Sequence, residues 1–160
     1  MKATRSGFTI IEIVVVVGIL ATLLSIGYIS AVNIQRRAPL SATVSVLMGD
    51  LRGQQTKAMI GDTQTGTTGD SYGIYFRPDA YILFKGSGYN PSDTANAVTP
   101  LPTNIIVSTA FSGSSVVFAK GSGDVAGFSQ GSSWVTLTQN LSGEHKTLTV
   151  NRYGAVISVQ

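Results

Sequence analysis

The chain has 160 residues, which is enough for one domain and a terminal element. It contains no cysteine, so neither a disulfide framework nor a thiolate metal site can form. The net charge is only +3. Because the charged residues are few and scattered, composition alone gives no indication of a nucleic-acid-binding protein.

A long apolar run lies close to the N-terminus. Two basic residues, Lys2 and Arg5, precede it, and Glu12 is the one charged residue between Phe8 and Ile34. As a helix this run is roughly 40 Å long, which is enough to span a bilayer. A cleaved secretory signal has a shorter apolar centre. An ordinary membrane anchor gives no reason for a carboxylate that costs about 2.5–3.5 kcal/mol at membrane depth.

The stretch from Ser6 to Glu12 resembles the prepilin leader junction of type IV pilins and pseudopilins. In that family a short basic leader ends in Gly, Phe usually follows, and Glu comes four residues later. Ile10 stands where the family usually has Leu. The resemblance implies that residues 1–7 are a prepilin leader peptide, that cleavage separates Gly7 from Phe8, and that Phe8 is then N-methylated.

The same resemblance implies a role for Glu12 in assembly. Its carboxylate would pair with the new amine of Phe8 in a neighbouring subunit, an arrangement suited to fixing register. The alternative is that Glu12 reaches the lipid headgroups alone. Residues 8–34 are thus predicted to form a transmembrane helix that becomes part of the filament core.

The helix is predicted to continue beyond the apolar run, with Pro39 marking a kink or a break. After it, apolar residues recur at helical spacing; they are Leu40, Val44, Leu47, Leu51 and Ala58. They predict an amphipathic helix over residues 35–61 that covers the sheet of its own domain. Gly61 and Asp62 are expected to end it.

Residues 62–160 are predicted to form a globular β domain. Residues 62–70 have the composition of a connection, and the strand-like runs are 72–76, 81–85, 105–108, 115–119, 133–139, 146–151 and 155–159. Residues 86–103 contain three prolines and are expected to form a long loop. Alternation of polar and apolar residues in the later runs is typical of half-buried antiparallel strands. The predicted fold class is therefore α+β, a long N-terminal helix packed on an antiparallel sheet, as in pilins.

Residues 116–157 resemble the GspH/FimT-type domain of minor pseudopilins. The resemblance depends on Val116-Val117-Phe118, on Trp134-Val135-Thr136-Leu137, and on Leu148-Thr149-Val150-Asn151 followed by Gly154. Many members have Arg after that glycine, whereas this chain has Ala155. The resemblance implies a minor subunit of a type II secretion system or a type IV pilus.

Some patterns look like catalytic or ligand-binding motifs but lack the required context. Residues 127–131 match G-x-S-x-G without a following helix, and residues 121–126 match a dinucleotide fingerprint with the same deficiency. The sole histidine, His145, lies in a predicted hairpin turn. Asp62 and Asp70 are too far apart for a calcium loop. We therefore expect no catalytic residue, no cofactor, no metal site and no enzymatic activity.

The function that these observations indicate is structural. The resemblance implies that the chain sits in the inner membrane with one span and its C-terminal domain outside, and then joins a periplasmic or cell-surface filament. The implied partners are other pilin or pseudopilin subunits, the prepilin peptidase/methyltransferase and the inner-membrane assembly platform. One alternative is a membrane-tethered binding module that does not polymerise. Another is a minor pilin that binds DNA during uptake through Lys85, Lys120, Lys146 and Arg152.

Overall fold

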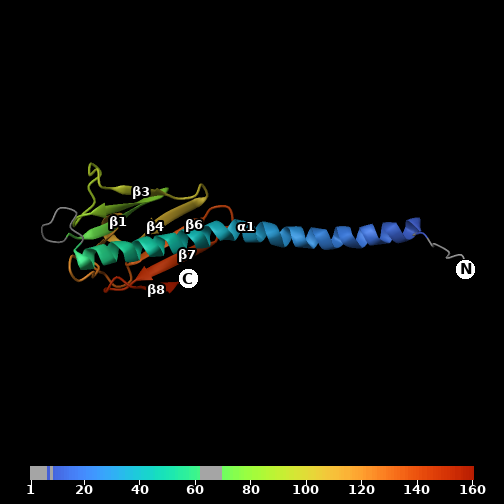
Figure 1. The fold of residues 1–160 in the computed structure, drawn as a ribbon. Helices are drawn as coiled ribbons and strands as arrows, with labels where there is room; N and C mark the ends of the chain where they lie inside the picture. Colours follow the sequence, from blue (N-terminus) through green and yellow to red (C-terminus); the bar gives the residue numbers. More distant parts are fainter. Residues whose placement is uncertain (1–6, 8, 62–69) are drawn as a thin grey trace, which may run out of the picture. The chain divides into compact units, whose positions relative to one another are not determined.

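The protein is described here by a computed structural model that covers residue 7, residues 9–61 and residues 70–160, with backbone only for residues 25–38. The chain divides into two compact units, Met1–Ala38 and Pro39–Gln160. Helix α1 (Ile10–Ile60) contributes its first part to one unit and its second part to the other. The Pro39–Gln160 unit, called the globular unit below, also holds all the strands that the structure describes (Figure 1).

Pro39 lies inside α1, so the helix is not broken there. Proline has no N–H, so the helix lacks one hydrogen-bond donor at this position. A separate bond lies one turn later, where the hydroxyl of Thr43 donates to the Pro39 carbonyl at 2.8 Å. The helix ends at Ile60, and Gly61 follows with a φ of 62°, as expected for a glycine that terminates a helix. Asp62, the other residue predicted at this end, lies outside the described residues, as does the connection 62–69.

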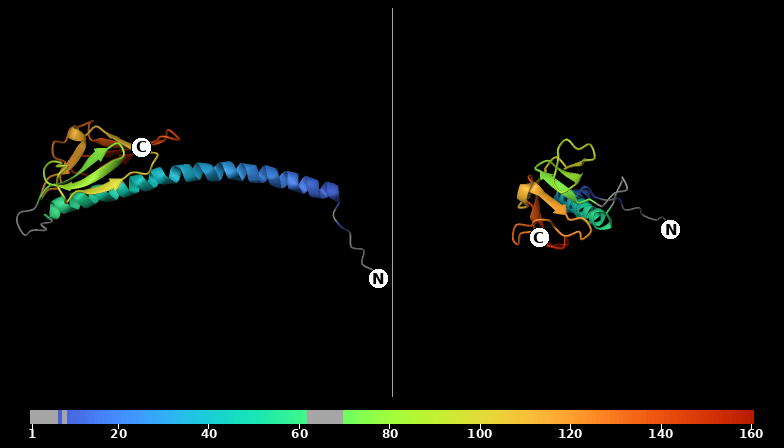
Figure 2. Two further views of the ribbon diagram at one scale, coloured as in Figure 1. Left: turned by 90° about the horizontal axis from the view of Figure 1, so that it is seen from above. Right: turned by 90° about the vertical axis from the view of Figure 1, so that its left-hand side faces the viewer.

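The apolar stripe predicted on the second part of α1 forms one side of the hydrophobic core. Its members are at most 5% exposed; they are Leu40, Val44, Leu47, Leu51 and Ala58. They pack against buried side chains of the strands, among them Ile74, Phe118 and Leu148. The views of Figure 2 show this part of α1 running alongside the strands. The predicted packing of an amphipathic helix on antiparallel sheet is therefore confirmed.

The strands form two antiparallel sheets of four strands each, where the sequence had suggested one sheet. The first has the order β3-β2-β1-β5, with β1 (Tyr72–Arg77), β2 (Ala80–Lys85), β3 (Ala97–Pro100) and β5 (Ser115–Phe118). The second has the order β4-β6-β7-β8, with β4 (Ile105–Thr109), β6 (Trp134–Gln139), β7 (His145–Val150) and β8 (Val156–Val159). A short 3-10 helix, η1 (Ser112–Ser114), lies between β4 and β5.

Strand β3 lies within residues 86–103, so the prediction of an uninterrupted loop there is wrong. It pairs with β2 in the register Ala80↔Pro100 to Leu83↔Ala97. Its residues are mostly exposed, and β3 lies at the edge of the first sheet. An exposed edge strand that contains a proline lacks the alternation by which a strand is predicted.

One glutamine side chain ties α1 to two turns that follow much later in the sequence. The Nε2 of Gln55 donates to the carbonyl of Gly123 at 3.1 Å and to that of Tyr153 at 2.6 Å. The Gly121 N–H donates to the Ala58 carbonyl at 2.8 Å. This arrangement, the Gln55 clamp, holds the residue 121–124 turn and the residue 151–154 turn against the end of α1.

A buried tyrosine links α1 to β2. Tyr81 is 1% exposed, and its hydroxyl donates to Asp50 Oδ2 at 2.6 Å. Burial of the phenol, followed by the hydrogen bond and the negative charge of Asp50, raises the pKa of Tyr81 far above its ordinary value of 10.0. Tyr81 is therefore neutral in the folded protein at all ordinary pH values.

We expect the globular unit to lose stability as the pH rises above about 10, because the unfolded chain then releases the Tyr81 proton that the folded state retains. The stabilisation of the folded state by the protonated Tyr81 is complete below that pH. It is lost as the pH rises toward the raised pKa of Tyr81 in the folded state. Y81F should flatten this alkaline decline, and at neutral pH it should cost about 1–3 kcal/mol through the lost bond to a carboxylate. Urea unfolding followed by circular dichroism between neutral pH and pH ~11 measures both effects. Y153F, at a side chain that is 70% exposed, should leave the decline unchanged; an unchanged decline in Y81F would contradict the prediction.

Candidate functional site

The start of α1 is organised by Thr9, the residue directly before the helix. The N–H of Glu12 donates to Thr9 Oγ1 at 3.3 Å, and the N–H of Ile13 donates to the Thr9 carbonyl at 3.2 Å. Thr9 is thus the N-cap residue, and Thr9-Ile10-Ile11-Glu12 matches the capping-box pattern. Thr9 was not among the residues predicted to have a role, although a threonine three residues before a glutamate at the head of an apolar run signals such a cap.

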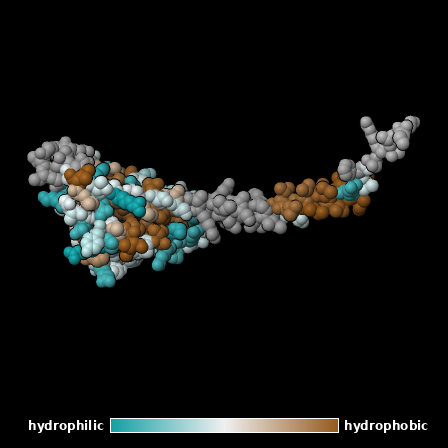
Figure 3. All heavy atoms as spheres, turned by 60° about the horizontal axis from the view of Figure 1, so that its bottom comes forward, coloured by the Kyte–Doolittle hydropathy of each residue, from teal (hydrophilic) through white to brown (hydrophobic). Residues whose placement is uncertain are grey.

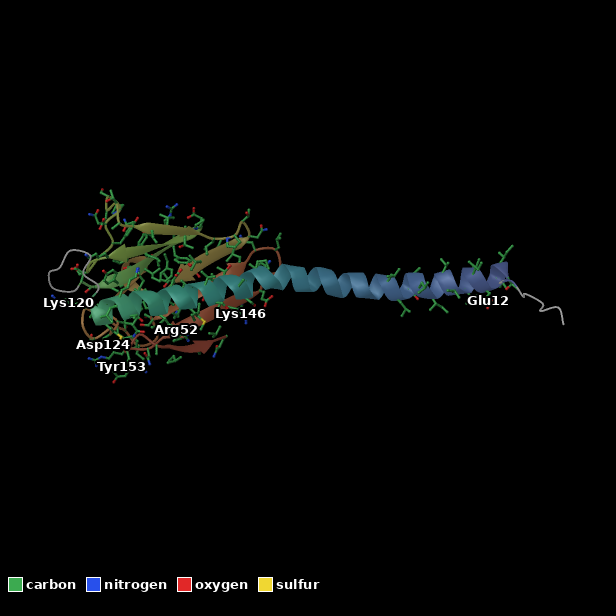
Figure 4. All side chains as sticks on the ribbon, viewed as in Figure 1. Glu12, Arg52, Lys120, Asp124, Lys146 and Tyr153 are labelled. Atoms are coloured by element: carbon green, nitrogen blue, oxygen red, sulfur yellow. The ribbon has the colours of Figure 1, made fainter. Side chains whose placement is uncertain are left out.

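Glu12 lies in the first turn of α1, where the N-terminal end of the helix dipole favours a negative charge. Its side chain is exposed, and Figure 4 shows it at the N-terminal end of the helix. The structure records no ion pair or hydrogen bond from its carboxylate to another described residue. The capping-box pattern thus gives a local reason for a glutamate at this position.

The predicted cleavage junction lies at the edge of what the structure describes. Gly7 is exposed, and a Cβ built on it would meet nothing within 4 Å. Phe8 and the rest of the predicted leader, residues 1–6, lie outside the described residues. The pairing predicted between Glu12 and a Phe8 amine therefore stays a prediction.

The first part of α1 carries apolar side chains on all sides. From Ile10 to Leu24 its large aliphatic side chains are 50% to 84% exposed, and Figure 3 shows a hydrophobic surface along this stretch with a hydrophilic area near its N-terminal end. Among the described residues no helix is both long and apolar enough to cross a membrane, so the transmembrane helix predicted for residues 8–34 is not confirmed. A helix that is apolar on every side is buried against other apolar matter when the protein functions.

Within the described residues, the motif-like segments lack the secondary structure that their motifs require. Residues 127–131 are followed by β6, not by the helix that a nucleophile elbow needs. Residues 121–124 form the turn held by the Gln55 clamp, and Val125, which follows it, makes a bridge to Phe118. His145 is exposed at the first position of β7. Among the described residues no cluster of histidine and carboxylate side chains could hold a metal ion.

The four cations considered for DNA binding do not form one patch. Lys85 pairs with Asp70 at 2.9 Å. Figure 4 shows Lys120 and Lys146 toward opposite ends of the globular unit. Arg152 lies exposed in the turn before β8. This distribution does not favour the DNA-binding alternative.

A family model, described as the prokaryotic N-terminal methylation motif, matches residues 2–28. The match includes Gly7, Phe8 and Glu12, and it supports a type IV pilin-like prepilin. The motif implies interaction with other pilin subunits and with a prepilin peptidase, and a membrane-anchored stage before a surface or periplasmic filament. No curated protein and no solved structure matches the chain. The family match ends before the globular unit, so the resemblance of residues 116–157 to the GspH/FimT-type domain stays a prediction.

Proposed function

We propose that the chain is a structural subunit, a minor pilin or pseudopilin, of a type IV pilus or a type II secretion pseudopilus, and that it has no enzymatic activity of its own. The observation that carries the proposal is the methylation motif at the head of an apolar, exposed helix that continues into a globular unit. The resemblance of residues 116–157 to the GspH/FimT-type domain supports a minor subunit.

In this proposal the helix has two successive roles, first as a membrane anchor and then as part of the filament. The peptidase hydrolyses the bond between Gly7 and Phe8, and a methyl group is transferred from a separate methyl donor to the new amine. At this stage the helix spans the inner membrane once with the globular unit outside. The assembly platform then moves the subunit into the filament, where apolar helices bury one another. Thr9 fixes where the helix begins, so the carboxylate of Glu12 lies one turn from the new N-terminus, where the Phe8 amine of a neighbour can compensate its desolvation.

The intact mass of the protein, isolated from membranes of cells that contain its own prepilin peptidase, tests the pathway. We expect a mass that lacks Met1 to Gly7 and carries one additional methyl group. A full-length mass would contradict the proposal and indicate a membrane-anchored β domain. A mass that lacks everything to about Ala31 would indicate a secreted protein with a longer signal.

Glu12→Gln should leave leader removal intact but prevent incorporation into filaments, because the amide cannot offset the charge of a buried amine. The measurement is the amount of the variant in sheared filaments relative to the membrane fraction. Thr9→Ala is the matched control, since it weakens the helix start by about 1 kcal/mol and keeps the carboxylate. If T9A blocks assembly as completely as E12Q, helix capping alone is enough to explain why Glu12 is needed for assembly. If E12Q assembles normally, the charge pair is contradicted.

A further inference from the structure

The globular unit has a recess that is lined by residues from 110–115 and from 125–133. Its volume is about 360 Å³, and we call it the serine recess because half of the residues that line it are serines. They are Ser112, Ser115, Ser129, Ser132 and Ser133. Binding sites for small molecules have volumes of roughly 300–1,000 Å³, and a dry cavity of ~150 Å³ holds one benzene ring. The serine recess therefore has room for one or two six-membered rings.

The buried part of this lining is mostly apolar and is held in place by the core. Phe111 and Val125 both belong to the hydrophobic core, and the ring of Phe111 stacks with that of Phe76 at 6.3 Å between centres. Ser133 is buried as well, and its hydroxyl donates to the Ser129 carbonyl at 2.9 Å. The recess is thus formed without a ligand, as most small-molecule sites are.

The other serine hydroxyls are available to a ligand. Among the described residues, the hydroxyls of Ser112, Ser115, Ser129 and Ser132 have no hydrogen-bond partner. Ser129 belongs to residues 127–131, the segment that resembled a nucleophile elbow. A serine hydroxyl both donates and accepts a hydrogen bond. The serine recess therefore presents several neutral donors and acceptors above an apolar floor.

The main-chain N–H groups around the serine recess are already used within the protein. That of Ala110 donates to the Trp134 carbonyl at 3.1 Å, and that of Ala126 donates to the Val117 carbonyl at 2.8 Å. The N–H of Ser132 donates to the carbonyl of Ser129 at 3.2 Å. An extended peptide is recognised mainly through main-chain hydrogen bonds, which these groups cannot supply. The hydroxyls are what the recess offers instead.

None of the described residues that line the serine recess carries a charge. A charged ligand would lose its hydration there without gaining a partner of opposite charge. A neutral sugar ring has hydroxyls that can exchange hydrogen bonds with serines, and C–H groups that can lie on an apolar floor. We propose that the serine recess binds one or two sugar units of a neutral oligosaccharide or polysaccharide. The inference does not depend on the proposed filament function.

Isothermal titration calorimetry of the full chain tests this proposal. The probes are three neutral tetrasaccharides, of glucose, mannose and galactose, and the charged tetragalacturonate. A detergent without a sugar head group keeps the apolar helix in solution, since a glycoside detergent would compete for the recess. We expect at least one neutral tetrasaccharide to bind saturably and tetragalacturonate not to bind. The proposal is overturned if no neutral tetrasaccharide binds, or if tetragalacturonate binds equally well.

Variants of the lining place the binding in the serine recess. A126F fills the recess with a ring and should weaken binding by more than ~10-fold; Ala126 is exposed, so the core is left unchanged. S112A/S132A removes two exposed hydroxyls and should weaken binding by at least ~5-fold, the loss of about two hydrogen bonds. It decides the question even if A126F does not fold. S87A is the control, because Ser87 is an exposed serine in the loop after β2 and does not line the recess.

Equal affinities of S112A/S132A and S87A would overturn the assignment of the sugar to the serine recess. A capped tetraserine peptide serves as a probe with hydroxyls but without a sugar ring. We expect it to bind more weakly than the best tetrasaccharide. If it binds as tightly and loses affinity in the same variants, the recess is a peptide site and the proposal is wrong.

Discussion

Gly73→Ala should destabilise the globular unit by more than about 3 kcal/mol, because the new methyl group has no room. A Cβ at Gly73 would lie 2.5 Å from the Phe84 ring and 2.6 Å from the Val116 carbonyl oxygen. Gly73 lies in β1 between β2 and β5, and its carbonyl accepts a hydrogen bond from the buried Gln54 side chain at 2.9 Å. Neither the strand nor α1 can shift without loss of these bonds. A loss of this size removes much of the ~5–15 kcal/mol that holds a domain folded.

Urea unfolding of the full chain, followed by the fluorescence of Trp134, measures the effect, since Trp134 is the sole tryptophan and begins β6. Gly53→Ala is the control. Gly53 lies exposed in α1, and a Cβ there meets nothing within 4 Å. It should raise stability by up to about 1 kcal/mol through helix propensity. Equal stabilities for G73A and the unmodified chain would show that the strands around Gly73 are not as closely packed as described.

Gly154→Ala should cost about 2–4 kcal/mol, from backbone strain and from damage to the Gln55 clamp. Gly154 has a φ of 76°, and a Cβ on it would meet the Gln55 side-chain amide and lie 2.9 Å from the Gly123 carbonyl oxygen. The same urea experiment measures the loss. Because the two positions share a contact, the cost of G154A should be smaller in a Q55A background than in the unmodified chain.

Gly127→Ala separates the two contributions. Its φ is 65°, close to that of Gly154, but a Cβ there meets nothing within 4 Å. G127A should therefore show the backbone cost alone, about 1–2 kcal/mol. If G154A costs no more than G127A, the clamp contributes nothing measurable.

The helix and the type of pairing could be predicted because their signals are local. Spacing placed Leu40, Leu47 and Leu51 on one buried face, and alternation identified β6 and β7. The division into two sheets could not be predicted, since it depends on which strands pair. β1 pairs with β5 and β4 with β6, each across intervening segments, and alternation carries no information on partners.

For the candidate site too, contiguous features could be predicted from the sequence, and features that join distant segments could not. The residues of the prepilin motif are contiguous, so a short stretch from Gly7 to Glu12 is enough to indicate them. The apolar recess lined by residues from 39–46 and 99–102 joins segments that are far apart in the sequence, and part of it belongs to β3, which was not predicted as a strand. Thr9 differs from both, because its role as N-cap residue follows from a local pattern and could have been predicted from the sequence.

The Gln55 clamp also constrains the order in which the chain folds during synthesis. Gln55 bonds to partners 68 and 98 positions later in the sequence, and the stripe of α1 is covered in part by β6 and β7. Translation proceeds at ~5–20 residues per second, and contacts between distant residues slow folding. The newly made helix therefore has to wait, with Leu47 and Leu51 uncovered, until the residue 151–154 turn has emerged. During that interval the uncovered apolar side chains make the nascent chain prone to aggregation.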